Sequence, residues 1–440
     1  MKNILLLITF VLSTNLSAQD FDRKKMDSLF TLIESNQKGM GSIYISEEGK
    51  EAYHHAFGFA SKEDNIKATD KTKYRIGSIS KTFTASIILR LIENGKLSLS
   101  TKLSDFYPEI KNSQEITIAQ LLKHRSGIFN FTSAEDFTSW MEQPISKEDL
   151  VKKIAGNGSV FEPNAKFEYS NSNYVLLSFI AEKVENKDLA QLIKEMVCKP
   201  CALENTYYGA KIATKNNEAK SYTKSNEWQL APESDMSIPQ GAGAIVATPK
   251  DLNIFLNCLF NYKIVSEKTV QAMMEIEDGY GLGMFQVPFY DKKAFGHNGA
   301  IDGFQSNAYY FPVENVSIAF TANGLAMPIN DIMIGALSIY FGKDYSLPEF
   351  KETKALNLKS EDLDKYLGVF SSPSFPLKIT ITKKDNILVG QATGQPSFSL
   401  EAYETDKFKF EQAGLKLEFI PLGNKMILKQ GGGEYELTKE

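Results

Sequence analysis

The residues most able to do chemistry form the segment Ser78-Ile79-Ser80-Lys81, which opens a stretch with the apolar pattern of a helix. A spacing of three residues places the Ser78 hydroxyl and the Lys81 amine on one face of that helix. A hydroxyl becomes a useful nucleophile when a base takes its proton. A lysine can be that base when burial or a nearby cation lowers its pKa from about 10.4. The segment therefore predicts a Ser–Lys nucleophile.

A second segment with the same spacing, Ser221 to Lys224, lies in a polar region without an adjoining amphipathic helix. We interpret it as a solvated loop. The spacing alone is a weak signal, so the prediction for Ser78 depends on the other polar segments that accompany it.

Two such segments are Tyr169–Asn171, at the start of a later helical pattern, and His297–Ala300, just before a predicted pair of strands. A Tyr hydroxyl near one or two cations can have its pKa lowered from about 10, so Tyr169 could take a proton or give one. Each segment has an ordinary structural interpretation when taken singly. In this order after Ser78, they predict a catalytic site.

Signatures of other hydrolases are absent from the sequence. The chain has four histidines, no H-E-x-x-H pair, no G-x-S-x-G turn and no Walker A loop. Its formal net charge of -5 is spread along the chain, which does not favour nucleic acid or an anionic membrane as a partner. We expect a small-molecule or peptide substrate and no metal or organic cofactor, and the oligomeric state stays open.

The motifs S-x-x-K, Y-x-N and H-x-G make the chain resemble the serine β-lactamase and penicillin-binding-protein superfamily. The likeness is strongest to its class C β-lactamase, D,D-peptidase and esterase branch, and it covers roughly residues 24–342. Three further segments are similar to family signatures: Leu121–Gly127, Gly241–Ala244 and Tyr280–Gly283. The resemblance implies Ser78 as the nucleophile, with Lys81 and Tyr169 managing the protons. Which of these two is the base stays open.

The same resemblance implies the residues that bind substrate. Asn171 would contact Lys81 or the substrate amide, and His297 occupies the first position of the third motif. The backbone N–H groups of Ser78 and Ala300 would form an oxyanion hole, where each donor is typically worth about 3 to 4 kcal/mol. Gly299 would let its strand approach the substrate closely.

The third motif departs from the class C β-lactamases, which usually have K-T-G where this chain has His297-Asn298-Gly299. An imidazole is only partly charged near pH 7, so we expect weaker and more pH-dependent binding of a substrate carboxylate. The resemblance then implies an acyl-enzyme hydrolase of D-amino-acid peptides, β-lactams or small esters. The alternatives are a penicillin-binding sensor that stays acylated and a vestigial, non-catalytic relative.

These motifs need a scaffold, and the apolar patterns predict one. Strands are expected at 41–60, 304–311 and 315–322, and helices at 79–94, 117–123, 172–185, 188–197, from 248, and at 328–341. Strands from both chain ends flank a helical middle. We therefore predict an α/β (α+β) fold with helices on an antiparallel sheet and the site between this sheet and a helical lobe.

Beyond about residue 356, short alternating runs such as Leu377, Ile379 and Ile381 predict a small all-β module. It resembles the small barrels appended to many members of the superfamily, and it could cap the cleft or bind a partner. We expect a hydrolase domain over 19–350 and a barrel-like domain over 356–440.

Residues 1–18 have a basic start, an apolar centre and a small-residue end, which predicts a secretory signal peptide and a periplasmic or secreted protein. No later stretch approaches the roughly 18 to 20 apolar residues of a transmembrane helix. Cys198, Cys201 and Cys258 are interpreted as packing residues, although a Cys198–Cys201 disulfide stays open.

Overall fold

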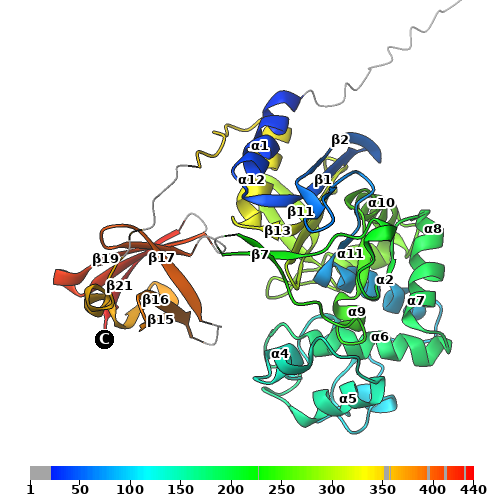
Figure 1. Cartoon of the computed structure of the whole chain (residues 1–440). Helices are drawn as coiled ribbons and strands as arrows, with labels where there is room; N and C mark the ends of the chain where they lie inside the picture. The colour runs from blue at the N-terminus through cyan, green and yellow to red at the C-terminus, as the bar shows by residue number, and fades with distance from the viewer. Residues whose placement is uncertain are drawn as a thin grey trace, which may run out of the picture.

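The chain is described by a computed structural model that covers residues 21–225, 227–350, 356, 358–393, 397–410, 414–430 and 433–440 (Figure 1). The predicted signal peptide lies outside the described residues. Within them, an antiparallel sheet carries helices on both faces, a mostly helical lobe packs beside it, and a closed barrel follows. The predicted fold class is confirmed.

The central sheet has six strands in the order β10-β11-β12-β13-β1-β2. Strands from the two ends of this region meet in its middle, where β1 pairs antiparallel with β13 and Ile43 lies opposite Phe320. Both strands are buried along nearly their whole length, because helices cover both faces of the sheet. The strands are β1 (Gly39–Glu47), β2 (Lys50–Phe57), β10 (Phe285–Phe289), β11 (Lys292–Ile301), β12 (Phe304–Phe311) and β13 (Val316–Leu325).

Two pairs of helices cover this sheet. On one face, α1 (Arg23–Ser35) and α12 (Ile329–Tyr340) enclose a core with Phe30 and Phe320. On the other face lie α2 (Ser80–Glu93) and α10 (Pro249–Phe260), where the rings of Phe83 and Phe255 stack at 3.7 Å. The Thr248 hydroxyl caps α10 as its sequence predicts. Short strands join these layers: β3 (Phe59–Ser61), β4 (Ile66–Lys67), β5 (Tyr74–Arg75), β6 (Tyr207–Tyr208), β7 (Tyr222–Lys224), β8 (Trp228–Leu230) and β9 (Ile245–Ala247).

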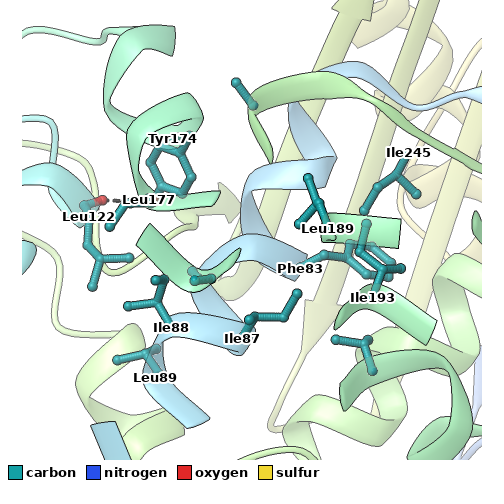
Figure 2. Close-up of a cluster of buried hydrophobic side chains, with 14 of the residues drawn as sticks. Phe83, Ile87, Ile88, Leu89, Leu122, Tyr174, Leu177, Leu189, Ile193 and Ile245 are labelled. Atoms are coloured by element: carbon teal, nitrogen blue, oxygen red, sulfur yellow. Dashed lines mark hydrogen bonds between the residues drawn. The ribbon is translucent and has the colours of Figure 1, made fainter. Parts of the chain in front are cut away.

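The helical lobe is built around α6 (Asn171–Glu185), which packs on α2. Figure 2 shows their shared core, in which Tyr174 donates a hydrogen bond to the carbonyl of Leu122. No helix among the described residues has the length and apolar character needed to cross a bilayer. The other helices are α3 (Ile118–Leu122), α4 (Phe137–Trp140), α5 (Lys147–Gly156), α7 (Leu189–Leu192), which continues as a π-helix to Cys198, α8 (Lys199–Cys201), α9 (Gln240–Gly243) and α11 (Glu267–Met273).

The C-terminal module is a closed antiparallel barrel in which β14 pairs with β21. Alternate residues such as Ile379 and Ile381 point into its own apolar core, as the alternation predicts. Its strands are β14 (Gly368–Ser372), β15 (Phe375–Lys384), β16 (Ile387–Ala392), β17 (Phe398–Glu404), β18 (Lys407–Phe410), β19 (Leu415–Ile420), β20 (Lys425–Gln430) and β21 (Gly433–Lys439).

The segment Ser221–Lys224 is not the solvated loop that its polarity predicts. It forms β7, which pairs with β8, and both Ser221 and Tyr222 are buried. The Ser221 hydroxyl accepts a hydrogen bond from the backbone N–H of Gly303. The prediction failed because the partner that buries this segment is distant in sequence.

The cysteine assignment also needs correction. Cys201 and Cys258 form a disulfide, with their Cα atoms 5.6 Å apart, whereas Cys198 is a buried free thiol close to the Thr206 carbonyl. Helix α8 packs against α10, so tertiary structure joins cysteines separated by 57 residues. The interpretation of Cys201 and Cys258 as packing residues is therefore wrong, and the Cys198–Cys201 pairing that stayed open does not form.

Replacing Cys201 and Cys258 together with Ala should lower the free energy of unfolding by about 2 to 4 kcal/mol, since the cross-link restricts the unfolded chain. Urea unfolding measures this loss. Cys198→Ala is the control and should cost clearly less. A non-reducing peptide map that links Cys198 to either of the others would contradict the assignment.

Candidate active site

Ser78 lies in a short 3-10 turn, η1 (Gly77–Ile79), directly before α2. Its side chain is partly exposed, while Ile79 and Lys81 beside it are buried. Gly77 has a φ of 50°, and a Cβ there would come within 2.8 Å of the Ala300 nitrogen. A glycine is therefore required for the turn that presents Ser78 at the surface.

The Lys81 amine is completely buried and has three hydrogen-bond partners. Its Nζ lies 2.9 Å from the Ser78 Oγ, 2.7 Å from the Asn171 Oδ1 and 2.8 Å from the carbonyl oxygen of Ala242. These partners are a hydroxyl, an amide oxygen and a backbone carbonyl, so none brings a negative charge. Burial consequently lowers the pKa of Lys81 well below its ordinary value.

Tyr169 stands two residues before α6 and is half-buried. Its hydroxyl shares a hydrogen bond with Ser78, and the Lys81 Nζ lies 4.9 Å from the centre of its ring. Burial raises the pKa of Tyr169, and the hydrogen bond to Ser78 offsets only part of this rise. The expected lowering by a nearby cation is wrong, because the nearest lysine is itself desolvated and disfavours its own charge.

Asn171 is the first residue of α6. Its Oδ1 accepts from Lys81, its Nδ2 donates to the Thr132 Oγ1 at 3.0 Å, and its backbone N–H donates to the Asn130 Oδ1 at 2.9 Å. Of the two contacts predicted for this side chain, the structure shows the one with Lys81. Thr132 and Asn130 were not predicted, because no pattern marks their loop.

Strand β11 runs directly against the turn that carries Ser78. A Cβ on Gly299 would lie 2.1 Å from the Ile76 carbonyl oxygen and 3.0 Å from the Ser78 nitrogen. The Ser306 hydroxyl of β12 donates to the same Ile76 carbonyl at 2.9 Å. The backbones of Ser78 and Ala300 are thereby held side by side, an arrangement able to offer two N–H groups to one carbonyl oxygen.

The β10 pairing ends where Phe285 lies opposite Gly296. Residues 297–301 of β11 therefore extend past β10 next to Ser78, and an extended substrate could lie along this edge. The sequence placed these residues before a strand pair, whereas they are part of β11 itself. The polar run Asp291-Lys292-Lys293 had obscured the start of this strand.

His297 is buried, with 1% of its surface exposed. Its Nε2 lies 3.0 Å from the Tyr280 hydroxyl and its Nδ1 2.5 Å from the carbonyl oxygen of Asn298. Burial first, and then the charge on Lys81, lower the pKa of His297 to about 3. The imidazole is therefore neutral at pH 7 rather than partly charged, and its side chain is not exposed to solvent.

His124 packs against Tyr169 and the start of α6. Their ring centres are 4.3 Å apart, and the His124 Nδ1 accepts a hydrogen bond from the Ser170 backbone N–H at 3.1 Å. The imidazole is completely buried, which keeps its pKa well below the ordinary value. His124 thus fixes the backbone between Tyr169 and Asn171. Its only signal in the sequence was its place in the family-like segment Leu121–Gly127.

Among the described residues, no three His, Cys, Asp or Glu side chains are grouped so that they could hold a metal ion.

The chain is similar in sequence and fold to several known proteins. The family model described as Beta-lactamase matches residues 31–332. Penicillin-binding protein 4* of Bacillus subtilis (strain 168) is 24% identical over 95% of this chain and 98% of its own. The octameric penicillin-binding protein homologue from Pyrococcus abyssi has a TM-score of 0.65 at 24% identity, covering 94% of this chain and 99% of its own. The D-amino acid amidase from Ochrobactrum anthropi SV3 has a TM-score of 0.65 at 21% identity, and the match covers 72% of this chain and 99% of the amidase chain.

The low pKa of His297 makes a prediction about acid stability. In the unfolded chain, His297 binds a proton below about pH 6.5, whereas in the folded chain it does so only near pH 3. The contribution of neutral His297 to the free energy of unfolding is therefore complete above pH 6.5 and is lost as the pH falls from 6.5 toward 3. When the pH falls from 7 to 4.5, the free energy of unfolding of His297→Gln should decrease by about 2 to 3 kcal/mol less than that of the wild type.

Urea unfolding at the two pH values measures this difference. Ser306→Ala is the matched control, because it alters a buried residue beside the same turn and removes no titrating group. Between the two pH values, the free energy of unfolding of Ser306→Ala should decrease by as much as that of the wild type. An equal loss in His297→Gln and wild type would show that the folded protein protonates His297 readily.

Proposed function

Because the chain belongs to the beta-lactamase family, we propose that it is a serine hydrolase in which an amide or ester acylates Ser78 and water releases the acyl group. The observation that carries this proposal is the Lys81 amine, buried without a carboxylate and 2.9 Å from the Ser78 Oγ. A structural lysine gains little from such a position, whereas a general base requires it.

The hydrogen bonds of Lys81 can be made by a neutral amine as well as by an ammonium, which would donate to all three oxygens. A neutral amine has two N–H donors and one lone pair, and the two donors can serve the Asn171 Oδ1 and the Ala242 carbonyl. The lone pair then faces the Ser78 hydroxyl and can accept its proton as the oxygen attacks the substrate carbonyl. Lys81 is accordingly the base in this proposal.

Tyr169 serves as the acid. Its raised pKa keeps the hydroxyl protonated at neutral pH, and its hydrogen bond to Ser78 places it beside the bond that breaks. Tyr169 gives its proton to the leaving nitrogen or oxygen, and the proton held by Lys81 replaces it. Water then attacks the Ser78 ester, and the same groups return the proton to the Ser78 oxygen.

The backbone N–H groups of Ser78 and Ala300 are proposed to stabilise the negative oxygen of the tetrahedral intermediate. Support comes from the steric limits around Gly77 and Gly299, which let the two backbones lie in contact. Loss of one such donor typically lowers kcat by about 10²- to 10³-fold.

For the substrate, we propose a neutral acyl group rather than one that carries a carboxylate next to the scissile bond. The buried, neutral His297 offers no charge where related enzymes use a lysine. The solved D-amino acid amidase shares the fold, which supports D-amino-acid amides and related esters as the class to test first.

We also propose that the protein is exported. The sequence of residues 1–18 supports this, and so does the Cys201–Cys258 disulfide, because such bonds persist in oxidising compartments. Intact mass of the protein purified from its own cells would show a chain beginning near residue 19. A full-length mass would contradict export through this segment.

Ser78→Ala should abolish covalent labelling by a fluorescent penicillin and lower turnover of nitrocefin and p-nitrophenyl butyrate by at least about 10³-fold. Intact mass and steady-state kinetics measure the two effects. Ser221→Ala removes the serine of the second S-x-x-K segment and is the matched control, which should keep its label.

Each other outcome of this experiment has a meaning. Labelling by penicillin without turnover of any reagent would favour a sensor, and a wild type inert to all three would favour a non-catalytic relative. A covalent label that persists in Ser78→Ala would show that Ser78 is not the nucleophile.

The neutral state of His297 also predicts a pH profile. Between pH 6 and 8, the ratio of kcat/KM for p-nitrophenyl butyrate to that for p-nitrophenyl hemisuccinate should stay constant, since a group with a pKa of about 3 does not titrate there. An imidazole with a pKa of about 6.5 that bound the carboxylate would change the ratio by about tenfold or more. Such a change would contradict the proposed neutral recognition.

A further inference from the structure

A buried ion pair connects the two segments that carry the Ser78 and Ala300 backbones. Arg75 stands three residues before Ser78, and Asp302 stands two residues after Ala300. The Arg75 guanidinium donates to the Asp302 Oδ2 at 2.9 Å, and the two side chains are 2% and 0% exposed. One short bridge therefore spans the same pair of segments that meet at Gly77 and Gly299.

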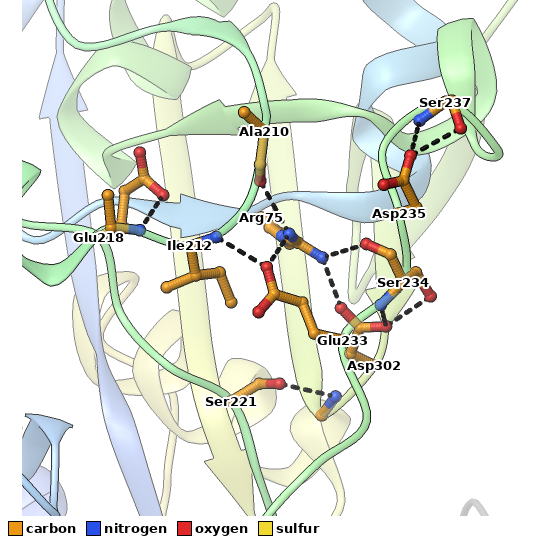
Figure 3. Close-up of polar contacts among 12 residues, drawn as sticks. Arg75, Ala210, Ile212, Glu218, Ser221, Glu233, Ser234, Asp235, Ser237 and Asp302 are labelled. Carbon is orange, nitrogen blue, oxygen red and sulfur yellow. Dashed lines mark hydrogen bonds and ion pairs between the residues drawn. The ribbon is translucent and has the colours of Figure 1, made fainter. Parts of the chain in front are cut away.

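The rest of the network fixes both ends of this bridge (Figure 3). Arg75 also donates to the carbonyls of Ser234 and Ala210, at 2.8 and 2.9 Å, and to the Glu233 Oε1 at 2.7 Å. The second oxygen of Asp302 accepts from the Ser234 N–H at 3.0 Å and from its hydroxyl at 2.6 Å. Both oxygens of Asp302 are thus held, and neither side chain can turn away without leaving buried charge unpaired.

The backbone around the pair leaves little freedom. Arg75 lies in β5, paired with Val246 of β9, and the next residue, Ile76, donates its N–H to the Ile245 carbonyl. Asp302 has a φ of 54° in the turn that ends β11. An anchor at this turn fixes where the end of β11 lies, and so fixes Ala300.

We propose that Arg75 and Asp302 are positioning residues of the oxyanion hole, which hold the Ser78 and Ala300 N–H groups at the separation that one carbonyl oxygen requires. This inference rests on the proposed serine hydrolysis. Neither side chain touches the substrate, and both act through the backbone of the two segments. A displacement of about 1 Å at such a site can cost about 10²-fold in rate.

The two carboxylates around Arg75 provide an internal comparison. Asp302 directly follows the last residue of β11 and is fully buried. Glu233 is 32% exposed and accepts a hydrogen bond from the N–H of Ile212, which is not part of this strand. If the guanidinium merely needed a counter-charge, loss of either carboxylate would leave the rate per folded active site unchanged. If positioning matters, Asp302 should matter far more.

Asp302→Asn should lower kcat for p-nitrophenyl butyrate by about tenfold or more, while KM changes little, because the lost contact acts in the transition state. The affinity of butylboronic acid, whose adduct with Ser78 places an oxygen in the hole, should fall in parallel. Glu233→Gln should change both quantities by about threefold or less. Rates are counted per titrated active site, so loss of folded protein does not imitate the effect.

A folded Asp302→Asn with unchanged kcat and boronate affinity would overturn the inference. So would equal losses in Asp302→Asn and Glu233→Gln. If Asp302→Asn does not fold, Ser234→Ala decides, because it removes one donor to Asp302 and should produce a smaller loss of the same kind. A wild type that no ester acylates would instead refute the proposed function, which separates the two failures.

Discussion

The desolvated amine of Lys81 is the constraint around which this molecule is arranged. Its hydrogen-bond partners come from η1, from the start of α6 and from α9, three segments separated by most of the hydrolase region. An amine removed from water needs all of these partners, so the packing of α2, α6 and α9 around it is coupled to its protonation. A shift of any of these helices would leave the amine unpaired or admit water and restore its ordinary pKa.

The sheet makes a separate contribution. Helix α2 lies on the face of the sheet opposite α1 and α12. The turn η1, directly before α2, packs against β11. In the proposed mechanism, the helical side supplies the groups that move protons, and the sheet supplies the backbone that faces the carbonyl oxygen. Chemistry of this kind needs both in register, and the contact between Gly77 and Ala300 is where the two parts meet.

Sequence reasoning succeeded where one local pattern determines the outcome. The spacing of Ser78 and Lys81 follows from helix geometry, and alternation was enough to predict the barrel strands. The neutral state of His297, the raised pKa of Tyr169 and the Cys201–Cys258 bond depend on what surrounds these groups in three dimensions. The same is true of β7, whose burial comes from a turn far along the chain. The Arg75–Asp302 bridge has no signal at all, since its members are individually ordinary charged residues.

The neutral imidazoles bring no charge to the surroundings of Lys81, whose pKa is lowered by burial. A charge on Lys81 lowers the pKa of both His297 and His124, and a charge on His297 lowers that of His124 as well. A lysine in place of His297 would bring an ammonium into this buried region near Lys81 and would attract a carboxylate or water to it. Instead, the ring centres of the buried His124 and His297 lie 4.3 and 6.3 Å from the ring centre of Tyr169. The departure from K-T-G therefore does more than remove a carboxylate-binding cation, because it places an uncharged, buried imidazole beside Tyr169.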